Sequence, residues 1–162
     1  RRIGHVSPAL HLRQLQRSSI RDVLLSGFFD TLGLYDKPSG RQIEEAGEWA
    51  RLFGIHVVLE RQMDRVSFGI QRVALIVRAM IKEPELLLLD EPCHGLDDHN
   101  SELVLSAART VAEQKLSTLL FVSHDPAHTI PALTHSLNLK PHAAGGYTAE
   151  TTIHTRYEKG DT

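Results

Sequence analysis

The sequence predicts an α/β fold built on a parallel β-sheet, and three observations support this prediction. The four leucines at residues 86–89 lie between two prolines, in a segment too short for a helix, which indicates a fully buried strand. A second apolar run, at residues 117–124, has the same character. Segments with helical periodicity precede and separate these two runs. Buried strands that alternate with helices are typical of βαβ units and a parallel sheet.

The helical segments are recognised by the spacing of their apolar residues and by signals at their ends. Three of them precede the leucine run, at residues 18–36, 41–55 and 70–84. The first begins with two serines that can cap a helix, the second ends near Gly54, and the third ends at a proline. These segments predict a helical region that spans about residues 15–80. Beyond the leucine run we expect a helix at residues 99–115 and a short helix that begins at Asp125.

The C-terminal part has a different pattern, typical of a β-hairpin. Residues 135–141 and 147–157 alternate in polarity, and a Gly-Gly pair lies between them. We therefore expect residues 1–162 to form one partial domain with three parts. These are the helical region, a core at residues 85–140 and a C-terminal hairpin or tail at residues 141–162.

Composition narrows the class of protein. The chain has 162 residues, of which 41% are hydrophobic and 23% are charged, as expected for about one soluble globular domain. The net charge of -2 gives no strong nucleic-acid signal. Cys93 is the only cysteine, which excludes an internal disulfide and favours the cytosol. The sequence begins without a methionine, in the middle of a pattern, so we expect it to be a piece of a longer protein.

Asp90 and Glu91 follow the four leucines directly. In doubly wound sheets, ligands bind beyond the carboxyl ends of the strands. An aspartate after an aliphatic run is suited to hold Mg²⁺, and a glutamate beside it can act as a general base toward water. Taken alone, the pattern fits a strand that ends in two solvated acids equally well.

Two other segments present groups that can bind phosphate. The stretch "VSFGIQR" places Ser67 and Gly69 at the start of the third helical segment, where backbone N–H groups and the helix dipole attract anions. The alternative is an ordinary serine helix cap. The stretch "LLFVSHD" ends the second apolar run in His124, which can hydrogen-bond a phosphate. A purely structural histidine is the alternative there, and it is the commoner case.

Taken together, the order and spacing of these motifs resemble the second half of an ATP-binding cassette (ABC) ATPase domain, over roughly residues 3–130. "VSFGIQR" resembles the signature loop of the family, "LLLLDEP" its Walker B motif with the catalytic glutamate, "HGLD" its D-loop and "FVSHD" its switch-histidine motif. The resemblance implies a P-loop NTPase-type parallel sheet with a helical signature subdomain. Residues 85–140 then correspond to the core from Walker B to the switch histidine.

The resemblance also implies roles for individual residues. It assigns catalysis to Glu91 and His124, Mg²⁺ to Asp90, contacts with a partner's ATP to Ser67, Gly69 and Gln71, and the D-loop position to Asp97. The implied cofactors are ATP and Mg²⁺. The implied partners are a second ABC cassette, in tandem in the full-length chain or as a homodimer, and a membrane permease. The implied location is the cytoplasm, as a peripheral protein on the inner face of the plasma membrane.

The sequence departs from the family pattern at several positions. No segment reads G-x-x-x-x-G-K-[ST], so the phosphate-binding Walker A loop is missing and the predicted sheet is truncated. We expect Walker A to lie outside this chain, and the isolated chain to be inactive. Pro8 or Ser7 occupies the usual glutamine position of the Q-loop. Phe68 and Ile70 replace a glycine and a glutamine of the signature, which indicates a weak half-site.

Three functions follow from this resemblance. "LIVRAMIKEPELLLLDEP" is most similar to molybdenum-transport ATP-binding proteins, so the first is an ATP-binding and ATP-hydrolysing subunit that energises import of molybdate or another small anion. The second is an ABC ATPase that works away from membranes, in DNA repair or translation. The third is a degenerate regulatory cassette that dimerises without turnover. The altered signature and Q-loop favour the third, whereas the intact Asp90, Glu91 and His124 argue against it.

Overall fold

The computed structural model describes residues 3–7, 15–142 and 145–154. The chain divides into two compact units, Arg1–Thr129 and Ile130–Thr162, and each is described by itself. Among the described residues, no helix has both the length and the apolar character needed to cross a membrane.

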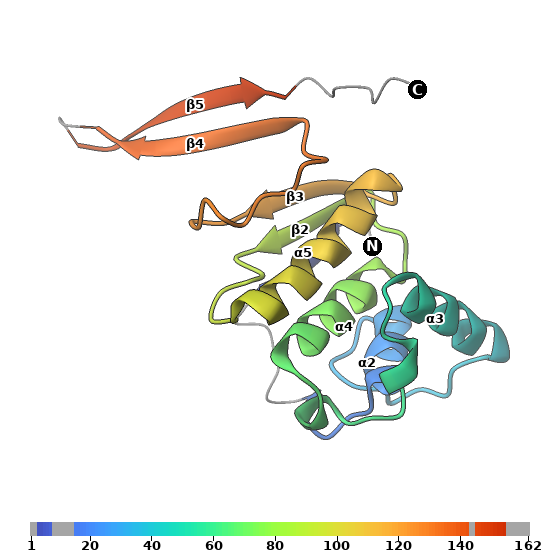
Figure 1. The fold of residues 1–162 in the computed structure, drawn as a ribbon. Coiled ribbons are helices and arrows are strands. Elements are labelled where there is room, and N and C mark those ends of the chain that lie inside the picture. The colour runs from blue at the N-terminus through green and yellow to red at the C-terminus, as the bar shows by residue number, and fades with distance from the viewer. Residues whose placement is uncertain (1–2, 8–14, 143–144, 155–162) are drawn as a thin grey trace, which may run out of the picture. The chain divides into compact units, whose positions relative to one another are not determined.

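A three-stranded parallel sheet forms the centre of the first unit (Figure 1). Its strands are β1 (Ile3–Val6), β2 (Leu86–Asp90) and β3 (Thr118–Val122), in the order β1-β2-β3. Both neighbouring pairs are parallel, which confirms the predicted α/β class. The periodicity analysis did not single out β1 as a strand.

Burial alternates along the strands of this sheet. Leu87 and Leu89 of β2 are fully buried, whereas Leu86 and Leu88 are only half-buried. In β3, Leu120 and Val122 are 50% and 40% exposed. The prediction of fully buried strands is therefore wrong. The reason is that α4 (Phe68–Met80) contacts β1 and α5 (Asp98–Glu113) contacts β3, so the two helices cover the face on which Leu87 and Leu89 lie.

Three α-helices lie in the region predicted to be helical: α2 (Ile20–Ser26), α3 (Gly40–Leu52) and α4. Each begins after a serine whose hydroxyl accepts a backbone N–H of the first turn: Ser19, Ser39 and Ser67. Helix α2 packs against both of the others. Short 3₁₀ helices complete the region at Gly27–Phe29, His56–Val58 and Met63–Arg65.

Helix α2 ends well before residue 36, where the periodicity placed its end. The α-helix stops at Ser26 and continues as the 3₁₀ helix Gly27–Phe29, where the chain passes very close to α4: a Cβ on Gly27 would lie 2.5 Å from the carbonyl oxygen of Arg78. Asp30 then adopts a left-handed conformation, with φ of 56°, which turns the chain away from a helical path.

Helix α5 is confirmed, with Asp97 as its N-cap, but the short helix expected from Asp125 is wrong. Asp125 forms a turn instead. Its carboxylate accepts the N–H of Ala127 at 2.8 Å and its carbonyl accepts the N–H of His128 at 3.1 Å. This local side-chain bond competes with helix formation.

The second unit contains the predicted hairpin. Strands β4 (His135–Pro141) and β5 (Tyr147–Ile153) pair antiparallel, and Gly145 and Gly146 have positive φ in the connection. Strand β4 coincides with the hairpin strand predicted at residues 135–141, so the hairpin begins within the range 85–140 that the sequence analysis gave to the core.

Candidate functional site

The site is built at the carboxyl end of β2, where Asp90 is the last residue of the strand. Asp90 pairs with Val122 of β3, and its side chain is half-buried. Within the described residues, no group hydrogen-bonds the Asp90 carboxylate. A carboxylate left without a protein partner at a strand end is a hard oxygen ligand, and it therefore fits Mg²⁺.

The backbone of Glu91 holds a conformation that is uncommon for a side chain of its size. Its φ is 48°, in the left-handed region that non-glycine residues seldom adopt. Two backbone hydrogen bonds fix it: its N–H donates to the Val122 carbonyl at 2.9 Å, and its carbonyl accepts the N–H of His94 at 3.0 Å. Such conformations persist only where the surroundings enforce them, and they cluster at functional sites.

His124, which lies two residues beyond β3, reaches the side chain of Glu91. Nδ1 of His124 and Oε1 of Glu91 are 2.7 Å apart. Since a carboxylate only accepts hydrogen bonds, Nδ1 carries the proton and donates it. This hydrogen bond, together with the negative charge of Glu91, raises the pKa of His124. The two residues predicted as catalytic therefore lie in direct contact.

The predicted signature residues lie at the start of α4. The Ser67 hydroxyl accepts the N–H of Ile70 at 3.3 Å, as an N-cap. The N–H of Gly69 donates to Asn100 Oδ1 at 3.0 Å, and the side-chain amide of Gln71 donates to the Val66 carbonyl at 3.1 Å. Gly69 and Gln71 are thus engaged within this chain, whereas the neighbouring Phe68 is 64% exposed.

Asp97 and Asn100 connect the D-loop to the signature loop. The Asp97 carboxylate accepts the backbone N–H of Asn100 at 2.8 Å and its side-chain amide at 3.0 Å. The backbone bond is the main cause that lowers the pKa of Asp97. Asn100 in turn accepts from Gly69. The sequence analysis missed Asn100, because its contact with Gly69 depends on the packing of α4 against α5.

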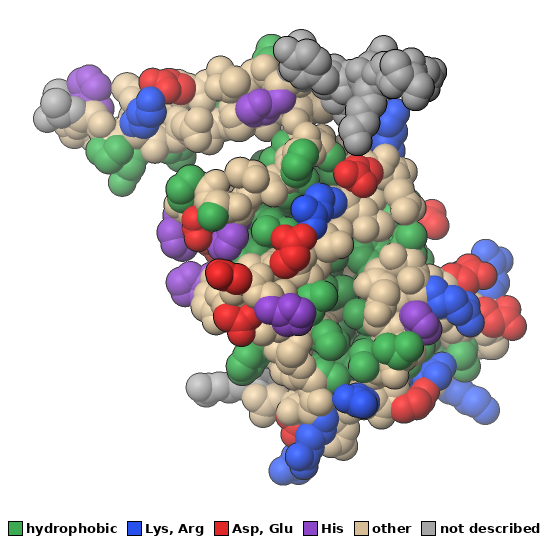
Figure 2. Space-filling model, in the orientation of Figure 1, with side chains coloured by type: hydrophobic (Ala, Val, Ile, Leu, Met, Phe, Trp, Pro, Cys, Tyr) green, Lys and Arg blue, Asp and Glu red, His purple; other side chains and the backbone are tan. Residues whose placement is uncertain are grey.

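The sequence analysis placed His94 in the D-loop motif but gave it no role at the site. It lies in the turn after β2, and its ring centroid is 6.1 Å from that of His124. Histidine and acidic side chains gather on the side of the first unit toward which β2 and β3 point (Figure 2). The spacing of three residues between Glu91 and His94 could have served as a signal for this cluster, but His124 is distant from both in sequence.

Arg72 and Cys93 are buried. Among the described residues, Arg72 Nη1 has no hydrogen-bond partner, and the Cys93 thiol lies 3.9 Å from the Ser101 carbonyl oxygen. Burial lowers the pKa of Arg72 and raises the pKa of Cys93 to about 11. A thiol with this pKa stays protonated at neutral pH, so Cys93 is not a reactive nucleophile.

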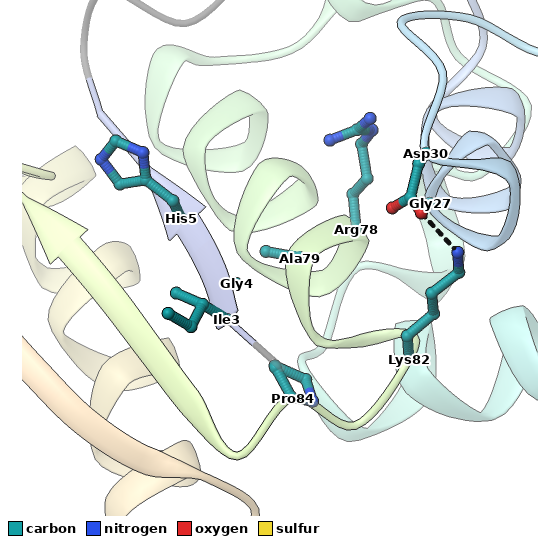
Figure 3. Close-up of a pocket in the computed structure, with 9 residues that line it drawn as sticks. All are labelled: Ile3, Gly4, His5, Gly27, Asp30, Arg78, Ala79, Lys82 and Pro84. Atoms are coloured by element: carbon teal, nitrogen blue, oxygen red, sulfur yellow. Dashed lines mark hydrogen bonds and ion pairs between the residues drawn. The ribbon is translucent and has the colours of Figure 1, made fainter. Parts of the chain in front are cut away.

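A separate pocket lies near the start of β1, and none of the predicted site residues lines it (Figure 3). Lys82 and Asp30 form an ion pair at 2.9 Å on its wall, and Arg78 donates to Ser26 and to the Thr31 carbonyl. The charged side chains on its wall are therefore already engaged within the chain. Of the two Q-loop candidates, Pro8 lies outside the described residues.

Comparison with known proteins identifies relatives both by sequence and by structure. The sequence profile of the family described as ABC transporter matches residues 1–94. The ABC transporter ATP-binding protein ModF of Escherichia coli (strain K12) is 39% identical over 86% of this chain and 29% of its own length. The ABC transporter ATP-binding protein YlmA of Bacillus subtilis (strain 168) is 34% identical over 86% of this chain and 53% of its own length. The molybdate import ATP-binding protein MolC of Haemophilus influenzae is 28% identical over 75% of this chain and 48% of its own length.

Solved structures agree on the fold. A nucleotide-free ATP-binding cassette from an ABC transporter superimposes with a TM-score of 0.66 at 18% identity, over 82% of this chain and 55% of that chain. A dimeric cassette in a post-hydrolysis state, bound to ADP and Pi, gives 0.61 at 22% identity, over 83% of this chain and 56% of that chain. The chain thus spans about half the length, or less, of these relatives.

Proposed function

The chain belongs to the ABC transporter family, and on that premise we propose that it forms part of an ATP-hydrolysing subunit of an import system. The observation that carries the proposal is the contact between Glu91 at the end of β2 and His124 after β3, next to Asp90, whose carboxylate has no hydrogen-bond partner in the described part of the chain. This arrangement supports the proposal because the three side chains that would serve as metal ligand, general base and phosphate-binding group lie on one edge of the sheet.

The proposed cofactors are ATP and Mg²⁺, and each residue has a distinct task. Asp90 would hold Mg²⁺, which when bound neutralises charge on the phosphates. The Glu91 carboxylate accepts a proton from the attacking water. Because Nδ1–H of His124 donates to Glu91, Nε2 is the ring nitrogen left for a phosphate oxygen. The raised pKa of His124 favours the doubly protonated ring, in which Nε2 is a donor.

The signature loop would serve the ATP of a second cassette, in tandem or in a homodimer. Ser67 is suited to this contact because its hydroxyl accepts from Ile70 and still has a proton to donate. The Gly69 N–H and the Gln71 amide already have partners in the chain. We therefore assign the main contact to Ser67 and a supporting role to Gly69 and Gln71, with Asp97 holding the adjacent D-loop through Asn100.

The proposed cargo is molybdate or another small anion. This rests on the likeness to ModF and on the printed name of MolC, a molybdate import protein. Import would require a membrane permease as partner, which places the protein on the cytoplasmic face of the plasma membrane. Molybdate uptake by cells with and without the gene tests the cargo, and unchanged uptake would favour the non-transport ATPase.

A regulatory cassette without turnover is the second candidate, and one observation favours it. The N–H of Gly69 is engaged by Asn100, and the bulky Phe68 is exposed beside it, so the signature loop offers few free donors to phosphate. The two candidates differ in whether the full-length protein releases phosphate from ATP.

Glu91→Gln in the full-length protein tests the proposed function. The amide keeps the shape of the side chain but cannot accept the proton of water, so ATP turnover should fall about 10²–10⁴-fold while ATP binding is retained. Glu113→Gln, at the exposed end of α5, is the matched control and should keep the original turnover. Phosphate release and nucleotide binding are measured for both. Full turnover in Glu91→Gln would show that Glu91 is not the base.

A further inference from the structure

His94 joins the proposed catalytic pair in a cluster of three side chains that can bind a metal ion. Glu91, His94 and His124 each offer one ligand atom, and these atoms all lie within 4.8 Å of one another. The backbone sets this arrangement. A turn in which the His94 N–H donates to the Glu91 carbonyl brings those two residues together, and the Glu91 N–H ties the turn to Val122 of β3, next to His124.

The donor set indicates which ions would bind. Two imidazoles and one carboxylate are the ligands of many zinc sites that keep an open position for water. Mg²⁺ prefers oxygen ligands, whereas imidazole suits Zn²⁺, Cu²⁺ and Ni²⁺. We propose that Glu91, His94 and His124 form a binding site for a divalent transition-metal ion such as Zn²⁺, separate from the magnesium ligand Asp90.

The geometry allows this site to close on an ion by side-chain rotation alone. With bonds of roughly 2.0–2.1 Å, the ligand atoms of a tetrahedral zinc ion lie about 3.3 Å apart. Nδ1 of His124 and Oε1 of Glu91 are closer than that, at 2.7 Å, so the ion would replace their hydrogen bond. The His124 side chain is 72% exposed and that of Glu91 is 26% exposed, and His94 is exposed, so His94 and His124 have room to turn.

Metal binding here would regulate the proposed function, and this consequence rests on that function. A bound ion occupies both the Glu91 carboxylate and the His124 ring, so neither group is available to water or phosphate. The family resemblance places His94 in the D-loop motif but assigns it no catalytic or binding role, which distinguishes the proposed site from the catalytic pair. His94 is therefore the residue on which the test is built.

Zinc binding by the 162-residue chain is measured by calorimetry, with Mg²⁺ present in excess. We expect one Zn²⁺ per chain and at least tenfold weaker binding in His94→Asn, since removal even of groups that support ligands costs about 10–100-fold in affinity. His124→Asn should weaken binding in the same way. The matched control is His56→Asn, an exposed histidine of the helical region, which should bind as the original chain does.

Equal affinity in the original chain and in His94→Asn would overturn the proposal, because the zinc would then be bound elsewhere among the ten histidines. Co²⁺ absorption provides a second readout, since visible bands that His94→Asn loses report imidazole ligation. These measurements contain no ATP. The zinc site and the proposed ATPase function can therefore fail independently, the latter through Glu91→Gln turnover.

Discussion

Gly69 lies where the start of α4 packs against the start of α5. A Cβ at this position would lie 2.7 Å from Asn100 Oδ1 and 2.9 Å from both the Cα and the carbonyl oxygen of Asn100. Two of these three atoms belong to the backbone, which cannot move aside as a flexible side chain can. Gly69 therefore keeps the signature loop and the D-loop in contact, in addition to any role toward nucleotide.

Gly69→Ala should destabilise the chain by about 1–3 kcal/mol, the usual cost of overpacking. Gly47→Ala is the control, because Gly47 lies inside α3 and the nearest atom to its Cβ would be 3.9 Å away. That change should stabilise the chain by about 0.5–1 kcal/mol. Urea denaturation measures both. Equal stabilities for the two variants would mean that α4 and α5 can shift to fit the added methyl group without loss of stability.

Helix α5 depends on Asp97, which caps its first turn and has a charged carboxylate at the positive end of the helix dipole. The hydrogen bonds from Asn100 lower the pKa of Asp97 in the folded chain below its usual value of 3.8. A carboxyl group with a lowered folded pKa stabilises the fold above the unfolded pKa. That contribution is lost as the pH falls through the folded pKa.

Asp97→Asn should separate the contribution of the carboxylate charge to stability from that of the helix cap, because asparagine caps helices about as well as aspartate does. At pH 7 the original chain should be the more stable of the two. The difference should shrink as the pH falls below 3.8 and the aspartate becomes protonated. Denaturant midpoints for both proteins across this range provide the measurement. A difference that does not vary with pH would assign the stabilisation to the cap alone.

The elements also show what a sequence can predict and what it cannot. Strand β2 and helices α3, α4 and α5 follow from local periodicity and capping residues, and they lie close to their predicted positions. The early end of this helical path does not, because the left-handed backbone of Asp30, which ends it, leaves no signal in the spacing of apolar residues. The expected helix at Asp125 failed for a local reason, since its carboxylate binds the Ala127 N–H.

At the scale of the whole molecule, parallel strands explain why the candidate site could be predicted in part. Strands β2 and β3 end on the same edge, so Glu91 and His124 meet although 33 positions separate them in sequence. His94 and Asn100 escaped prediction because their contacts depend on loop geometry and helix packing. The leucine run likewise did not show that α4 and α5 cover the face of the sheet on which Leu87 and Leu89 lie.

The 162-residue chain alone should not hydrolyse ATP at a measurable rate. Phosphoryl transfer relies on a backbone cradle and a lysine that position the phosphates, and the sequence contains no Walker A motif to supply them. The carboxylates of Asp90 and Glu91 would repel a triphosphate that lacks such a cradle. Phosphate release with Mg²⁺ and ATP is the measurement. Steady release that Glu91→Gln abolishes would contradict the prediction and require a second cradle in this chain.

At position 91, the residue type that would be best for stability differs from the one that the proposed activity requires, because the backbone is left-handed. Glycine suits a φ of 48° best, whereas the proposed chemistry requires a carboxylate. Glu91→Gly and Glu91→Ala both remove the acid, but only alanine keeps the steric cost, so Glu91→Gly should be the more stable by about 1 kcal/mol. Thermal denaturation of the two variants checks this order. If the proposed chemistry holds, the carboxylate at this turn is therefore retained at a cost in stability that glycine would avoid.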